Sequence, residues 1–207
     1  MNRAFEDLFG VPAAFDGIPM AGRTDRGILE EGASRAGLEL SGGDAKRFGT
    51  RYALRLSEAL TEPARLKGVL PGVQALLEAI ATREVVFPAL LTGNCEEGAR
   101  IKLQHFDLWK FFRCGAYGDE VTERHELFPV AIERAFACGA PFVPSRDVLV
   151  VGDTVLDVEC AKAAGARSIA VATGPSDAGT LRSAGADVAL ENLTDIDGFL
   201  ELLSVKI

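Results

Sequence analysis

The sequence is 207 residues long and 48% apolar, a fraction that excludes an intrinsically disordered chain and suits one compact domain or a core with a smaller lobe. Its 22 Lys and Arg against 30 Asp and Glu give a net charge of −8, which argues against sequence-blind binding to nucleic acid or to an anionic membrane. No apolar run approaches the roughly 18 residues that cross a bilayer, the first residues lack the pattern of a secretory signal, and the four cysteines form no C-x-x-C, so we expect a cytoplasmic protein without a zinc site or disulfides.

Helical patterns fill the N-terminal third of the chain. We expect helices over Asn2–Phe9 and over Gly42–Leu60, because apolar residues recur there at the helical step. A helix between these two is expected to begin with Thr24 as its N-cap and Asp25 in its first turn. Glu62 and Pro63 are expected to end the last of the three.

Short apolar runs then alternate with helical patterns. The runs that predict strands are residues 85–91, 147–151, 168–172 and 187–190, and the helical patterns cover a helix opening at Pro71 and residues 95–112, 127–138, 155–164, 177–183 and 195–203. This alternation predicts an α/β fold with a parallel sheet covered by helices on both faces. We therefore expect a helical lobe over residues 1–68 and an α/β core over residues 69–207.

One candidate site follows the run that ends at Leu91. In parallel α/β folds, ligands bind at the carboxyl ends of the strands. The Thr92 hydroxyl, Gly93 and free backbone N–H groups around Asn94 would suit a phosphate oxygen at the start of the next helix. The alternative is a turn and helix cap without a ligand. Lys102, on that helix, could reach the phosphate, but we expect it on a solvated helix face.

A second candidate site follows the run 147–151. Asp153 lies just past the strand after Gly152, and Asp157 lies one helical turn further on. Two carboxylates so placed can share a hard cation, which prefers oxygen ligands. The alternative is that Asp153 only caps the helix and Asp157 is a solvated acid in its first turn.

Together these patterns resemble the haloacid dehalogenase-like (HAD) superfamily of hydrolases, most of which are magnesium-dependent phosphatases. The stretch Thr92-Gly93-Asn94 resembles the second motif of that family, and Gly152-Asp153-Thr154-x-x-Asp157 resembles its fourth. Arg124 lies where the basic residue of the third motif belongs, although most members have Lys there. The resemblance implies a Rossmann-like parallel sheet with an α-helical cap, as in phosphoglycolate-phosphatase-like members.

The resemblance also implies roles for the residues that hold phosphate. Thr92, Gly93 and Asn94 would bind the phosphoryl oxygens, and Arg124 would neutralise the charge that develops during transfer. Thr92, Arg124 and Asp153 would then be the catalytic residues of this chain. The alternative for Arg124 is an exposed loop cation.

For the metal and the substrate, the resemblance implies that Asp153 binds Mg²⁺ with Asp157 supporting the site. Arg23 in the cap would help to select a small phosphate monoester, either phosphoglycolate-like or a sugar phosphate. No nucleic-acid or membrane partner is expected.

The first motif of the family, Asp-x-Asp-Gly-Thr, is expected upstream of Met1. Its first Asp is the nucleophile, so we expect the first core strand to be missing and the chain as given to be inactive. Asp195-Ile196-Asp197-Gly198 matches part of that motif, but no apolar strand precedes it, and we interpret it as the start of a helix. The rival hypothesis is a non-catalytic relative that binds phosphate or a metal in a regulatory role.

Overall fold

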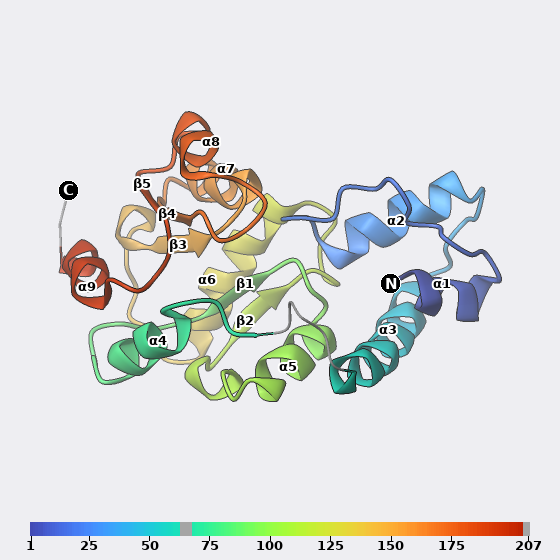
Figure 1. Ribbon diagram of the computed structural model, residues 1–207, viewed down its shortest axis with the longest axis horizontal. Helices are drawn as coiled ribbons and strands as arrows, with labels where there is room; N and C mark the ends of the chain where they lie inside the picture. The colour runs from blue at the N-terminus through green and yellow to red at the C-terminus, as the bar shows by residue number, and fades with distance from the viewer. Residues whose placement is uncertain (63–67, 205–207) are drawn as a thin grey trace.

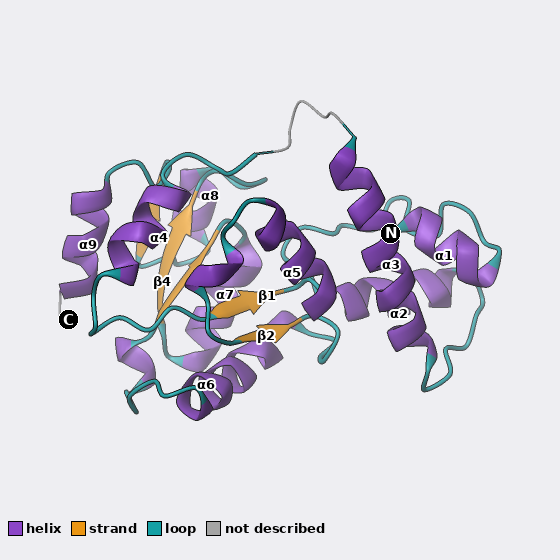
Figure 2. Ribbon diagram, turned by 90° about the horizontal axis from the view of Figure 1, so that it is seen from below, coloured by secondary structure: helices purple, strands orange, loops and turns teal. Residues whose placement is uncertain are grey.

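The computed structural model describes residues 1–62 and 68–204, and Figure 1 shows that the described chain has two parts. A helical lobe is built from three helices: α1 (Asn2–Phe9), α2 (Asp25–Arg35) and α3 (Asp44–Thr61). The remaining described residues form an α/β part that holds all the described strands (Figure 2). The predicted boundary between the helical lobe and the α/β core, at residues 68 and 69, adjoins residues 63–67. These five residues, which include Pro63, lie outside the described residues.

The helical lobe has a core of its own. The rings of Phe5, Phe15 and Phe48 bring α1, the segment after it and α3 together, with ring centroids 5.2 Å apart between Phe5 and Phe15 and 6.3 Å apart between Phe5 and Phe48. Edge-to-face packing of such rings adds to the free energy gained by burying them. Thr24 caps α2 as predicted, since its hydroxyl accepts a hydrogen bond from the Gly27 amide at 3.0 Å.

The α/β part alternates helices and strands, as predicted. In chain order it contains α4 (Val73–Ala81), β1 (Leu90–Thr92), α5 (Glu96–His105), β2 (Gly115–Tyr117), α6 (Leu127–Ala137), β3 (Leu149–Gly152), α7 (Val155–Ala164), β4 (Arg167–Val171), α8 (Ala178–Ser183), β5 (Val188–Leu190) and α9 (Ile196–Ser204). Neighbouring residues of β4 pack on opposite faces: Ile169 contacts α4 and α9, and Ala170 contacts α7 and α8. Helices therefore cover both faces of the sheet.

All the strand pairs are parallel, but they form two sheets. β1 pairs with β2, so that Thr92 lies beside Tyr117, and β3 pairs with β4, which pairs with β5. Leu91 of β1 and Val150 of β3 pack against the same cluster around Phe128 of α6. The two sheets thus share a core, although among the described residues no strand joins β1 to β3.

Two predicted elements differ from those observed, and one observed strand was not predicted. Only the end of the run 85–91 is a strand, and Val85 is 89% exposed. The helical pattern 95–112 breaks after His105, because Asp107 takes a left-handed conformation with φ of 57°. β2 was not predicted, since its three residues Gly115–Tyr117 include no β-branched side chain. None of the described helices is both long and apolar enough to span a membrane.

Candidate active site

The loop after β1 is in contact with the helical lobe. The Asn94 amide donates a hydrogen bond to the Thr92 hydroxyl at 3.2 Å, which closes a local turn. A Cβ at position 93 would lie far inside van der Waals contact of the Arg23 carbonyl oxygen and 3.3 Å from Nη1 of Arg124. Gly93 therefore allows the lobe and the Arg124 side chain to approach the loop closely.

Two N–H groups at the start of α5 are engaged by carboxylates, which corrects the expectation that they are free. The Cys95 amide donates to Oδ2 of Asp25 at 2.8 Å, and the Glu96 amide donates to Oδ1 of Asp119 at 3.1 Å. The first N–H groups of a helix have no partner within the helix, and the carboxylates of Asp25 at the start of α2 and of Asp119 in the loop after β2 satisfy two of these N–H groups here. A phosphate at this loop would be bound by the Thr92 side chain and neighbouring cations rather than by the helix start.

Lys102 does not lie on a solvated helix face, which corrects that expectation. Its ammonium donates to Oδ1 of Asn94 at 2.6 Å, and burial lowers its pKa. The hydrogen bond orients the Asn94 side chain toward α5. Lys102 thus connects α5 to the loop through its hydrogen bond with Asn94.

The loop after β3 contains the two predicted carboxylates, and their environments differ. Asp157 is 4% exposed and closes a capping box with Thr154, whose amide and hydroxyl donate to Oδ2 at 3.0 and 2.7 Å. Its other oxygen, Oδ1, forms an ion pair with Arg124. Both oxygens of Asp157 are engaged, so it is neither a solvated acid nor a free metal ligand.

Asp153 is half-buried and has a free carboxylate. Burial raises its pKa, the negative charge of Asp157 raises it further, and Arg124 opposes both effects. Within the described chain, only its own backbone amide donates a hydrogen bond to it. Gly174 packs against its carboxyl group so closely that a Cβ would not fit. A cation beside Asp153 would relieve the repulsion between the two carboxylates, which fits a hard metal ion.

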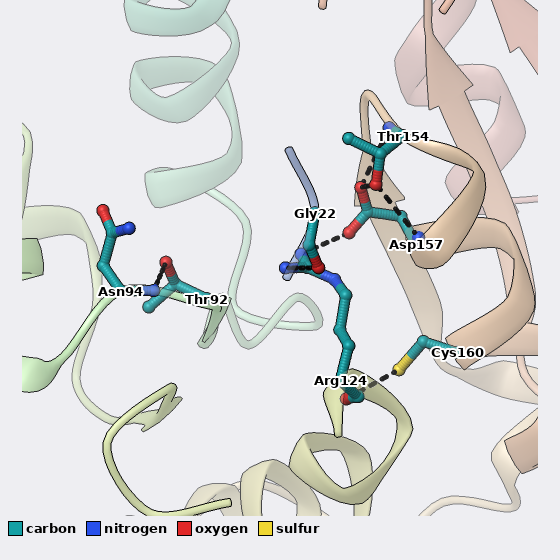
Figure 3. A network of polar contacts seen from close by, with 7 residues as sticks. All are labelled: Gly22, Thr92, Asn94, Arg124, Thr154, Asp157 and Cys160. Atoms are coloured by element: carbon teal, nitrogen blue, oxygen red, sulfur yellow. Dashed lines mark hydrogen bonds and ion pairs between the residues drawn. The ribbon is translucent and has the colours of Figure 1, made fainter. Parts of the chain in front are cut away.

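Arg124 connects the two loops and the helical lobe. It lies in a short 3-10 helix (Arg124–Glu126), and its side chain is only 12% exposed. Nη1 donates to the Gly22 carbonyl at 3.0 Å, and Nη2 pairs with Asp157. Nε is buried and has no hydrogen-bond partner in the part of the chain that the structure describes. Figure 3 shows the guanidinium between Gly22 and Asp157, with Thr92 and Asn94 across the site. Arg124 is therefore not an exposed loop cation.

Two other predicted residues lie apart from this cluster. Nη1 of Arg23 pairs with Glu31 at 2.6 Å inside the helical lobe, and it is the Arg23 backbone that contacts the loop after β1. Asp195 caps α9, because its Oδ1 accepts from the Gly198 amide at 3.0 Å. The interpretation of Asp195 as a helix start is confirmed.

Sequence reasoning missed the contacts that the lobe makes with the core loops. The sequence indicated Asp25 only as an acid in the first turn of α2, a place where an acid is favourable without any other partner. Its partner Cys95 is 70 residues away in the sequence. Among the described residues, no three His, Cys, Asp or Glu side chains are grouped closely enough to hold a metal by themselves.

The chain is similar to several known proteins. Residues 125–196 match a family model described as HAD-hydrolase-like. A phosphoglycolate phosphatase from Chromobacterium violaceum is 29% identical over 182 residues, which cover 87% of this chain and 74% of that protein.

Solved structures are similar to nearly the whole chain. A candidate β-phosphoglucomutase from Thermotoga maritima is 26% identical with a TM-score of 0.59, over 98% of this chain and 89% of that one. A predicted phosphoglycolate phosphatase from Haemophilus somnus 129PT has a TM-score of 0.65 at 18% identity, over 96% and 88% of the two chains, and this likeness concerns the fold.

Proposed function

We propose that the chain is a member of the haloacid dehalogenase-like superfamily, whose phosphatases it resembles, and that it acts on a small phosphate monoester by Mg²⁺-dependent phosphoryl transfer. The observation that carries this proposal is the buried guanidinium of Arg124. It lies beside Gly93 in the loop after β1 and pairs with Asp157 in the first turn of α7, and its Nε has no partner among the described residues. A buried donor without an acceptor costs free energy that an anionic ligand would recover.

In the proposed site, the phosphoryl group lies between the Thr92 loop and Arg124. The Thr92 hydroxyl would donate to one phosphoryl oxygen, with Gly93 and Asn94 forming the wall beside it. Arg124 would neutralise the charge that develops on the oxygens during transfer. Asp157 and Gly22 hold the guanidinium in place, so little reorganisation would be needed as the reaction proceeds.

We propose that Asp153 is this chain's Mg²⁺ ligand and that Asp157 supports it by fixing Thr154 and Arg124. The free carboxylate of Asp153 supports the first role, and the engaged oxygens of Asp157 support the second. When bound, Mg²⁺ would neutralise phosphoryl charge and orient the phosphate. One carboxylate is too few for a stable site, so further ligands must come from water and another segment.

We propose that the nucleophilic aspartate lies upstream of these 207 residues, on a strand seated between β1 and β3. In support, β1 and β3 have no common neighbour among the described strands, and Val151 within β3 is 45% exposed. An aspartate at the end of such a strand would face Arg124 and Asp153. Its carboxylate would attack phosphorus and displace the alcohol of the substrate, which leaves an aspartyl phosphate. Water would then hydrolyse the aspartyl phosphate, which releases inorganic phosphate and restores the carboxylate.

We propose further that the helical lobe acts as a cap and that the segment around Arg23 selects the substrate. The close approach of the Arg23 backbone to Gly93 supports this role. The named activity of the Chromobacterium relative makes a phosphoglycolate-like compound the first substrate to test, and the name of the Thermotoga protein makes a sugar phosphate the second. We also propose a cytoplasmic location, which the free state of all four cysteines favours.

The proposal is tested at Arg124, in a form extended upstream through the missing motif. We expect Arg124→Ala to lower kcat/KM about a hundredfold, equivalent to ~3 kcal/mol, because a preorganised charge facing the transferring group is lost. Arg124→Lys restores a charge toward Asp157 but has fewer donors, so we expect an intermediate value. Steady-state kinetics with an aryl phosphate and Mg²⁺ give both numbers.

Arg182 on α8 provides the matched control, because its guanidinium donates to the Ala189 carbonyl on the outer strand β5. Arg182→Ala should leave kcat/KM unchanged. A loss of less than about threefold in Arg124→Ala would show that Arg124 does not face the reacting phosphate.

A further inference from the structure

We propose that Asp25, a residue of the helical lobe, positions the phosphate-binding loop 92–94 by clamping it from both sides. This inference rests on the proposed function, because that function gives the loop its role. Asp25 would not touch the substrate. It would act through Gly93 and Cys95.

The clamp consists of two hydrogen bonds from a single residue. The Asp25 backbone amide donates to the Gly93 carbonyl at 2.6 Å, and Oδ2 of its carboxylate accepts from the Cys95 amide at 2.8 Å. These two partners flank Asn94 on either side. Asp25 therefore holds the Gly93 carbonyl of the loop and the amide of Cys95, the N-cap residue of α5.

Neighbouring residues of α2 strengthen the same contact. The Thr24 hydroxyl donates to the Thr122 carbonyl at 2.5 Å, and the Arg26 amide donates to the Gly118 carbonyl at 2.8 Å. The start of α2 is thus bonded to the loops after both β1 and β2. Asp25 is only 7% exposed, so water would not readily replace these bonds.

The environment of Asp25 indicates that its carboxylate has a specific use. Burial raises its pKa, and the Cys95 amide and the nearby Lys102 ammonium oppose that effect. A buried carboxylate is costly unless hydrogen bonds compensate it. Local capping of α2 does not need Asp25, because Thr24 already supplies that bond. The start of α5 also keeps a second cap, Asp119, so losing Asp25 should loosen the loop and leave the helix intact.

The consequence is that docking of the helical lobe and the shape of the phosphate loop depend on the same hydrogen bonds. If the lobe moves away at α2, Gly93 and Cys95 lose their partners. Phosphate affinity should therefore fall when the clamp is broken, even though no group that touches phosphate has changed.

The test compares Asp25→Ala with a matched control, Asp44→Ala. Asp44 is also 7% exposed and also caps a turn in the lobe, but its carboxylate accepts from the Ser41 amide at 2.8 Å, within the lobe. Two quantities are measured on each protein: the hydrogen-exchange rate of the amides of residues 93–96, and the dissociation constant for inorganic phosphate from an NMR titration.

We expect Asp25→Ala to raise both quantities about tenfold, which is the usual cost of a lost cap. Asp25→Asn should restore most of both, because its side-chain oxygen can still accept from Cys95. Asp44→Ala should change neither. If Asp25→Ala behaves like Asp44→Ala in both measurements, the proposal is wrong.

Two further outcomes are informative. If no variant and not even the unaltered protein binds phosphate, the proposed function fails, and the exchange rates alone decide whether Asp25 clamps the loop. If Asp25→Ala does not fold, Asp25→Glu takes its place, because the extra methylene displaces the acceptor oxygen. An Asp25→Glu protein with unaltered exchange and phosphate affinity would overturn the proposal.

Discussion

Asp153 and Asp157 show how one turn of helix separates the roles of two carboxylates. Asp157 points back to its own helix start and to Arg124, so its negative charge is fully compensated. Asp153 lies before the capping box, and the charge of Arg124 only partly opposes the effects of burial and of Asp157 on its pKa. The pair therefore combines a structural anion with a free one, and only the free one is suited to bind a cation directly.

This difference predicts unequal effects on metal binding. In the extended form, Asp153→Asn should weaken Mg²⁺ binding by at least tenfold, because a ligand is lost. Asp157→Asn should weaken it less, because its effect is transmitted through Thr154 and Arg124. Calorimetric titration of Mg²⁺ into both variants measures the ranking, and the reverse order would contradict the assignment.

The pKa of Asp25 predicts a pH dependence of stability. Its folded pKa is raised above the ordinary value of 3.8, so the folded state binds the proton more tightly than the unfolded state does. Its contribution to the free energy of unfolding is fully present below that value and is lost as pH rises through the folded pKa. Asp25→Asn cannot titrate and lacks this dependence.

We therefore expect the stability of the unaltered protein, relative to Asp25→Asn, to decline as pH rises above the ordinary aspartate pKa of about 4 and through the raised pKa of Asp25 in the folded state. Urea denaturation across this range measures the difference. Lys102 and Asp119 face Asp25 and are present in both proteins, so their effects largely cancel. A relative stability that increases with pH would show that burial does not control Asp25.

At the scale of elements, the start of α7 connects folding with the site. The capping box of Thr154 and Asp157 ends β3, begins α7 and holds the carboxylate that pairs with Arg124. Gly152 permits this turn, because a Cβ there would overlap the Asp157 carboxyl group. The hydrogen bonds that cap α7 therefore also hold the loop after β3, and with it the carboxylate that pairs with Arg124.

Removal of this cap should be costly. We expect Thr154→Ala to lower the free energy of unfolding by about 1–2 kcal/mol, since a buried acceptor for the Asp157 amide is lost. Asp177→Ala, which removes the exposed cap of α8, should cost less. Thermal or urea denaturation of both variants tests the order, and equal losses would mean that the capping box of α7 has no special weight.

The elements that the sequence predicts well are those that local patterns determine. The bounds of α1 and α7 agree with the predicted ranges, because apolar spacing and capping residues define both. β2 was missed because three residues carry too little pattern, and its burial comes from neighbours distant in the sequence. Asp153 was singled out by its position after an apolar run and Arg124 by the family resemblance, whereas the contacts of Asp25 with Gly93 and Cys95 are encoded by no local pattern.

At the scale of the molecule, two parallel sheets share one core, and the candidate site lies where β1 and β3 end. The loops after β1 and β3 meet at Arg124, and the helical lobe contacts both through Gly22, Gly93 and Asp25. β1 and β3 remain unjoined among the described residues. A strand between them would complete a single sheet and bring its carboxyl end to the same edge.

The most direct test of the central claim compares the 207-residue chain with a form extended upstream to include an Asp-x-Asp-Gly-Thr sequence. Both are assayed with an aryl phosphate and Mg²⁺. We predict appreciable turnover by the extended form and none above background by the 207-residue chain, because the proposed nucleophile lies on the added strand. Equal turnover by the two forms would contradict the account, since the nucleophile would then have to lie among the residues described above.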